Sequence, residues 1–196
     1  MSKQLFAIVF LALISISYSQ YISRGQCEDR KIKPVKNYLG INSYSFAGLL
    51  RRWFTVFTFN IAADCQVISY RNIGKYYNES EYTLTQKDVI NDKWLPGSNG
   101  VATSASDNGE GIINVKPNNA TDSVQFKILA FDSTSYTVDY NCVNIDSNYR
   151  REILYARTRY RSYTEKEAKL IDEVLKENGL ADIERTYIYQ EVIPCL

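Results

Sequence analysis

The chain has 196 residues, and its 23 basic and 22 acidic residues leave a formal net charge of +1. A chain of this length can form one domain with a sizeable core, and the balanced charge argues against a nucleic-acid-binding protein, which needs a basic surface. Histidine is absent. The chain therefore cannot build a Ser-His-Asp or Cys-His catalytic site, nor a zinc site that depends on histidine ligands.

The first residues of the chain predict a secretory signal peptide. Lys3 supplies a positive charge, residues 5–16 form a nearly unbroken apolar run, and the small residues Ser17 and Ser19 follow at the spacing of a cleavage site. A membrane anchor is the alternative, but the run is shorter than the roughly 20 residues that cross a bilayer as a helix. We therefore expect a signal peptide over residues 1–19 and one secreted domain over residues 20–196, without a membrane span.

Four cysteines, Cys27, Cys65, Cys142 and Cys195, are scattered along the chain. An even number of cysteines in a secreted chain predicts two disulfides, and the absence of CxxC pairs argues against a metal cluster. Four cysteines allow three pairings, among which the spacing does not choose. The acidic residues fall mostly on polar faces or in turns, where solvated surface charge is a simpler interpretation than acid-base catalysis. We expect a binding protein rather than an enzyme.

Short alternating segments separated by turns predict an all-β barrel or sandwich. In one of them Val124, Phe126 and Ile128 share a face, and turn dipeptides such as Asn99-Gly100 are dense between residues 91 and 111. The eight expected strands cover residues 52–60, 65–72, 80–89, 101–106, 111–116, 122–131, 135–143 and 149–160.

The hydrophobic period changes near the C-terminus. Thr164 and Glu167 form a capping box, apolar residues recur at helical spacing from Ala168 to Leu175, and Gly179 is a typical helix stop. This pattern predicts a helix over residues 165–178 whose apolar stripe packs on the barrel, followed by an extended segment over residues 185–190.

Eight strands, one helix and a last short strand resemble the lipocalins, and in particular the branch of apolipoprotein D and the insect bilin-binding proteins. Trp53 resembles the tryptophan that opens the first strand of that family and closes the barrel base. Arg157 resembles the family arginine that stacks on this tryptophan, a favourable cation–π arrangement. Residues 136–142 resemble the seventh strand, and residues 186–195 resemble the family's C-terminal tail.

The resemblance implies an eight-stranded up-and-down antiparallel barrel with the C-terminal helix on its outside. It also implies the disulfides Cys27–Cys142 and Cys65–Cys195. Two positions depart from the family pattern: Arg51 stands where a glycine usually precedes the tryptophan, and the second family motif keeps only Asp132. Both departures concern the closed end of the barrel, so they bear on recognition partners more than on the fold.

An eight-stranded barrel is wide enough to hold one small ligand. Strand alternation places Phe57 inside with Trp53, but the seventh strand has two interpretations, with either its tyrosines or Asp139 and Asn141 inside. Cys142 lies on the same face of this strand as the tyrosines, and it must point outward in order to reach the arm outside the barrel. This favours the second interpretation, in which Asp139 and Asn141 face inward. For every such residue plain core packing is the alternative. The expected ligand-binding residues are Phe57, Ile68, Tyr70, Phe126, Ile128, Asp139, Asn141, Arg151 and Tyr155.

The resemblance implies carriage of a small, mainly hydrophobic ligand, namely a tetrapyrrole, retinoid, sterol or fatty acid, without a required cofactor or metal. A lipocalin-fold scavenger of biogenic amines or inhibitor of host proteins is the alternative, and acidic cavity residues would favour the amine scavenger. An enzyme like the family's prostaglandin synthase ranks third, because its catalytic cysteine has no free counterpart if all four cysteines pair. The oligomeric state stays open. Sequons at Asn78 and Asn119 predict glycosylated loops.

Overall fold

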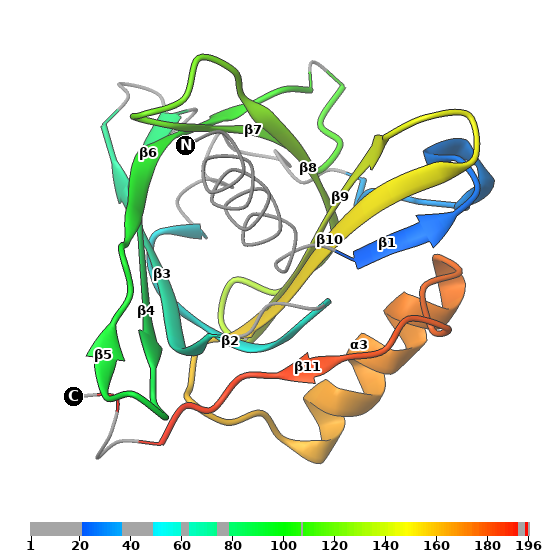
Figure 1. Cartoon of the computed structure of the whole chain (residues 1–196). Coiled ribbons are helices and arrows are strands. Elements are labelled where there is room, and N and C mark those ends of the chain that lie inside the picture. The colour runs from blue at the N-terminus through cyan, green and yellow to red at the C-terminus, as the bar shows by residue number, and fades with distance from the viewer. Residues whose placement is uncertain are drawn as a thin grey trace, which may run out of the picture.

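The computed structural model describes residues 21–36, 49–59, 63–73, 79–106, 108–191 and 195. Within these ranges one antiparallel sheet closes on itself through the pairing of its first and last main strands, which confirms the expected eight-stranded barrel (Figure 1). The main strands are β2 (Arg51–Thr58), β3 (Asp64–Asn72), β4 (Glu79–Asp88), β6 (Ser98–Ser104), β7 (Ile112–Pro117), β8 (Val124–Phe131), β9 (Tyr136–Asn144) and β10 (Tyr149–Thr158).

Three short strands extend the sheet. They are β1 (Tyr21–Arg24) beside β10, β5 (Lys93–Trp94) beside β4, and β11 (Thr186–Tyr187) beside β2. The strand expected at residues 101–106 begins earlier, because Gly100 pairs with Tyr82 of β4 rather than forming a turn. A Cβ on Gly100 would lie 2.1 Å from the carbonyl oxygen of Lys116. Glycine is therefore required there by the close approach of β7.

The expected helix is confirmed as α3 (Glu165–Glu177). Its N-terminus has the predicted capping box, in which the Thr164 hydroxyl accepts a hydrogen bond from the Glu167 amide, at 3.2 Å, and the Glu167 carboxylate accepts one from the Thr164 amide, at 2.6 Å. Gly179 follows with a φ of +64°, a conformation that favours glycine. Figure 1 shows the helix on the outside of the barrel.

The barrel has an inner and an outer apolar core. The outer core lies beneath α3, where Ile171 and Leu175 pack with residues of β9 and β10 such as Val138, Tyr140 and Leu154. Because this outer face of the late strands is covered, the tyrosine Tyr140 is buried there and not in the barrel interior. The inner core is built around residues that include Leu49, Trp53, Ile68, Tyr82, Ile113 and Ile128.

Phe57 belongs to the outer core, and its expected place inside the barrel is wrong. The register between β2 and β10 shifts by one residue, because Thr55 pairs with Arg157 whereas Phe57 pairs with Ala156. Val56 is therefore a bulge residue, and every later residue of β2 changes face. The Phe57 ring packs against Tyr187 of β11, with ring centroids 5.7 Å apart.

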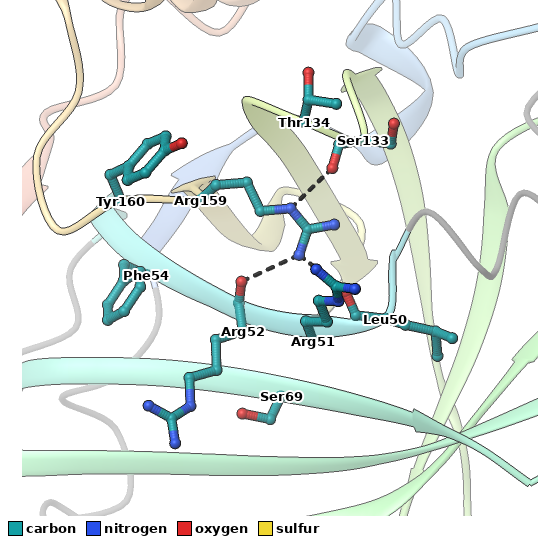
Figure 2. A pocket seen from close by; sticks show the side chains of 9 residues that line it. All are labelled: Leu50, Arg51, Arg52, Phe54, Ser69, Ser133, Thr134, Arg159 and Tyr160. Carbon is teal, nitrogen blue, oxygen red and sulfur yellow. Dashed lines mark hydrogen bonds between the residues drawn. The ribbon is translucent and has the colours of Figure 1, made fainter.

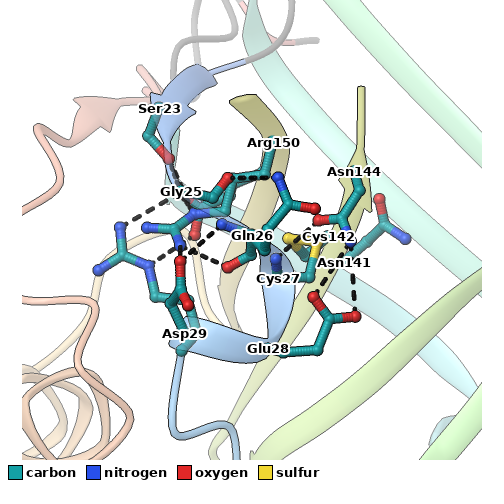
Figure 3. The surroundings of a disulfide bond; sticks show 12 residues. Ser23, Gly25, Gln26, Cys27, Glu28, Asp29, Asn141, Cys142, Asn144 and Arg150 are labelled. Carbon is teal, nitrogen blue, oxygen red and sulfur yellow. Dashed lines mark hydrogen bonds and ion pairs between the residues drawn. A yellow bond between two sulfur atoms is a disulfide. The ribbon is translucent and has the colours of Figure 1, made fainter. Parts of the chain in front are cut away.

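Two disulfides fix the chain ends to the barrel, in the pairing that the resemblance implies. Cys27, in the short 3-10 helix η2 (Cys27–Asp29), is bonded to Cys142 of β9, and Cys65 of β3 is bonded to Cys195. Figure 3 shows the first bond, beside which the amide of Cys27 donates to the Asn144 side chain at 2.7 Å. The N-terminal arm is thus held against β9 and β10. None of the helices in the described ranges has the length and apolar character required to cross a bilayer.

Candidate functional site: the barrel cavity

A cavity of about 220 Å³ lies inside the barrel, and we call it the barrel cavity. Seven of the eight main strands contribute to its wall, and most of its lining side chains are apolar or aromatic. The lining residues are Ile68, Tyr70, Tyr82, Leu84, Ser98, Ile113, Val115, Pro117, Val124, Phe126, Asp139, Ile153, Tyr155 and Arg157. An apolar wall with a few polar groups is the usual composition of a small-molecule site.

The charged groups of the barrel cavity form one ion pair. Arg157 of β10 donates to the carboxylate of Asp139 on β9, which also accepts a hydrogen bond of 2.7 Å from the Thr137 hydroxyl. Both charged side chains are about 5% exposed, so their attraction acts in a medium of low dielectric constant. Burial raises the pKa of Asp139, and the neighbouring Arg157 charge and the two hydrogen bonds offset this effect only in part.

Several donors in the barrel cavity have no acceptor among the described residues. The Nε atom of Arg157 is buried and has no hydrogen-bond partner. No hydrogen bond among the described residues involves the hydroxyls of Tyr70 and Tyr155, although both residues line the cavity. Burial raises the pKa of each of these tyrosines, so both hydroxyls keep their protons at neutral pH. These three donors can meet an oxygen acceptor on a bound molecule.

The donors are held in place by ring packing. The Arg157 guanidinium lies 4.2 Å from the centroid of the Tyr155 ring, and the Tyr155 ring packs against Phe126 with centroids 6.0 Å apart. A guanidinium over an aromatic face is favourable, and more so away from solvent. The side chains of Arg157 and Tyr155 are therefore ordered in the absence of a ligand, and such order lowers the entropic cost of binding.

The expected ligand-binding residues divide into three groups. Ile68, Tyr70, Phe126, Asp139 and Tyr155 line the barrel cavity. Ile128 and Asn141 are buried away from it, the first in the inner core and the second donating its amide to the Gln125 carbonyl oxygen at 2.8 Å. Arg151 and Phe57 do not line it, Phe57 because the bulge turns it outward.

Arg157, like Phe57, does not lie where the sequence predicted. It was expected to stack on Trp53, but it points into the cavity and pairs with Asp139. Arg159 stacks on Trp53 instead, with its guanidinium carbon 3.6 Å from the ring centroid. Because β10 ends at Thr158, the residue just beyond it reaches across the barrel base. Alternation along β10 places Arg157 on the same face as Ile153 and Tyr155. The sequence alone therefore carried the indication that Arg157 points into the cavity.

Two expectations concern residues outside the cavity. Asn119 lies exposed in the turn between β7 and β8. Asn78 and the expected signal peptide over residues 1–19 lie outside the described residues.

No protein-family model and no curated protein matches the sequence. Solved structures do match. Insecticyanin from the tobacco hornworm Manduca sexta is 16% identical, with a TM-score of 0.67 over 90% of this chain and 93% of that chain. H1 crustacyanin from the lobster Homarus americanus is 15% identical, with a TM-score of 0.64 over 87% and 91%. The siderocalin Ex-FABP is 14% identical, with a TM-score of 0.56 over 74% and 97%. These similarities show that the chain has the lipocalin fold.

Proposed function

We propose that the protein binds and carries a small, mainly apolar molecule in the barrel cavity. The observation that carries this proposal is an apolar cavity in which Arg157, Tyr70 and Tyr155 present donors that the described part of the protein leaves unused. A buried donor without a partner costs roughly 1–3 kcal/mol, and a ligand that supplies the acceptor recovers this free energy. The fold supports the proposal, since the similar siderocalin Ex-FABP is described as acting through dual ligand specificities.

The donors define the chemistry of the ligand. Its apolar body packs against side chains such as Ile68, Phe126 and Ile153, and an oxygen acceptor at one end meets Arg157. Tetrapyrroles, retinoids, sterols and fatty acids all combine these two features. The cavity acts by binding alone, and the proposal includes no catalytic step.

Carriage outside the cell is the second part of the proposal. The disulfides Cys27–Cys142 and Cys65–Cys195 support it, because such bonds persist in oxidising compartments. Their pairing also supports membership of the branch that contains apolipoprotein D and the insect bilin-binding proteins. The exposed turn that carries Asn119 supports N-glycosylation at that residue, and we extend this to the sequon at Asn78.

The scavenging of biogenic amines is not favoured by the cavity. An amine would need an available carboxylate, and among the described residues that line the cavity the only carboxylate, that of Asp139, already accepts hydrogen bonds from Arg157 and Thr137. Breaking a buried ion pair in order to form another would cost part of the binding free energy. A neutral or anionic acceptor leaves the existing pair intact.

The test is a titration of tryptophan and tyrosine fluorescence with hexadecanoic acid and with its methyl ester. We expect saturable binding of both, and tighter binding of the acid because Arg157 can make a charge-assisted hydrogen bond with the carboxylate. The variant Arg157→Gln should weaken binding of the acid by about tenfold or more, the effect of losing such a bond. The ester should be much less affected.

Arg151→Leu is the matched control, since it removes an arginine of the same strand that does not line the cavity. It should bind both ligands as the wild type does. If neither ligand binds with saturation, nor retinol, cholesterol or biliverdin in the same assay, the carrier function is wrong. If Arg151→Leu weakens acid binding and Arg157→Gln does not, the ligand's polar end lies elsewhere in the barrel.

A further inference from the structure

A second, wider pocket lies at the closed end of the barrel, and we call it the base pocket (Figure 2). Its volume is about 900 Å³, and it shares no lining residue with the barrel cavity. Three arginines, Arg51, Arg52 and Arg159, line it together with the hydroxyl side chains of Ser69, Ser133 and Thr134. No aspartate or glutamate of the described ranges lines it. The described lining thus combines three cations with hydroxyl groups, of which that of Thr134 donates to the neighbouring Asp132 carboxylate at 2.7 Å.

Arg159 is fixed in the wall of the base pocket. Its Nε donates to the Ser133 carbonyl oxygen at 2.8 Å, and its Nη1 donates to the carbonyl oxygens of Leu50 and Arg52, at 2.9 and 3.1 Å. These three carbonyl acceptors fix the orientation of the guanidinium. Burial, followed by repulsion from Arg51, lowers the pKa of Arg159. The pocket thus places like charges close together.

Arg51 and Arg52 are exposed, and in the described part of the chain neither forms an ion pair. Arg71 on the adjacent strand β3 behaves differently, because it pairs with Glu81. Unpaired guanidiniums beside a fixed third one create a local positive potential, which attracts anions. The near-zero net charge of the chain makes this concentration of arginines a local feature rather than a consequence of composition.

The backbone at Arg51 gives an independent indication. Its φ is +79°, in the left-handed region that favours glycine. A residue with a side chain is strained in this conformation. Strained residues of this kind cluster at ligand clamps and other functional sites. The cost at Arg51 is offset if its guanidinium binds a ligand.

We propose that the base pocket is a second binding site, specific for a sulfate or phosphate ester. The tetrahedral oxyanion of such an ester presents several acceptor oxygens, which match guanidinium groups and the hydroxyls of Ser69 and Ser133. The rings of Phe54 and Tyr160 also line the pocket, and Tyr160 is 69% exposed. These rings offer an apolar surface to the part of the ligand that carries the ester, such as a sugar ring.

Calorimetric titration with glucose 6-sulfate, glucose 6-phosphate and glucose tests this site and distinguishes the two esters. We expect saturable binding of at least one ester, no binding of glucose, and an affinity that falls with increasing salt. The variant Arg51→Gly should weaken ester binding by about tenfold or more, the effect of losing a charged hydrogen bond. Because glycine relieves the backbone conformation, the same variant should be as stable as the wild type or more stable.

Arg71→Gln is the matched control, since it removes a neighbouring surface arginine outside the pocket. It should leave ester binding unchanged. Equal losses in Arg51→Gly and Arg71→Gln, or no saturable binding of either ester, would overturn the proposal. Binding only to vesicles that contain anionic lipid would also overturn it, in favour of a membrane surface as the partner. The urea denaturation midpoint serves as the folding control for every variant.

Discussion

Two buried carboxylates on neighbouring strands have opposite surroundings. Glu152 of β10 faces outward beneath the N-terminal arm, where its carboxylate accepts hydrogen bonds from Arg30, Arg150, Tyr140 and Ser23. Asp139 of β9 faces the barrel cavity and accepts from Arg157 and Thr137. Although burial alone would raise the pKa of Glu152, its hydrogen bonds outweigh that effect and lower it. The pKa of Asp139 is raised because burial prevails.

The difference separates a structural network from the proposed binding site. The Glu152 network joins the N-terminal arm to the barrel, and its acceptor oxygens are fully used. The Asp139 pair leaves the Nε of its partner Arg157 without an acceptor. A buried polar network that is fully satisfied stabilises one structure, whereas a partly satisfied one costs free energy unless a ligand completes it.

The largest effect is expected for Glu152→Ala. The substitution removes a carboxylate that balances the buried positive charges of Arg30 and Arg150. It should therefore lower the free energy of unfolding by about 3–5 kcal/mol. Glu28→Ala is the control, since Glu28 is an exposed carboxylate in the same arm that accepts from Asn144. It should change stability by less than about 0.5 kcal/mol. Urea denaturation measures both, and similar losses would show that the network has no special role.

Arg159→Ala should have the next largest effect. The arginine stacks on Trp53 and donates to three backbone carbonyl oxygens, so its loss should cost about 1–3 kcal/mol of stability. Its removal should also change the Trp53 fluorescence, whereas Arg161→Ala, which removes a nearby arginine placed over Phe54, should not. An unchanged denaturation midpoint would mean that the barrel base does not depend on this stack.

Replacing both Asp139 and Arg157 should change the free energy of unfolding by a smaller amount, and in the opposite direction. In the ligand-free protein, the double variant Asp139→Leu/Arg157→Met should be as stable as the wild type or up to about 2 kcal/mol more stable, because an apolar pair avoids the desolvation of two charges. The same variant should lose its preference for hexadecanoic acid over the methyl ester. A large loss of stability would show that the pair, like Glu152, is mainly structural.

Lowering the pH should change the stability of the protein in opposite directions through Glu152 and through Asp139. The stabilisation by Glu152 is present above the unfolded-state pKa of about 4.3 and is lost as the pH falls through its lower folded-state value. The cost of Asp139 is present above its raised folded-state pKa and is relieved as the pH falls toward about 3.9. The stability difference between the wild type and Glu152→Gln should therefore shrink from about pH 6 to pH 3. Urea denaturation across this range measures it, and a constant difference would contradict the lowered pKa.

The sequence predicted the features that depend on local periodicity. Alternation placed the main strands, and a capping box with an apolar stripe placed α3 within one residue of its observed end. Strand alternation put Asp139 and Tyr140 on opposite faces, and the Cys27–Cys142 disulfide that the resemblance implied indicated that Asp139 faces inward. These inferences rest on periods of 2.0 and 3.6 residues, which neighbouring residues fix by themselves.

What only the tertiary structure decided depends on how distant strands meet. The bulge at Val56 arises where β2 closes against β10, about a hundred residues later in the chain, and it moves Phe57 from the interior to the outer core. The choice between Arg157 and Arg159 as the partner of Trp53 depends on where β10 ends relative to the barrel base. The arginines of the base pocket come from segments that the closed barrel brings together. Local sequence sets which residues share a face, but the register of non-local pairing sets where each face begins and ends.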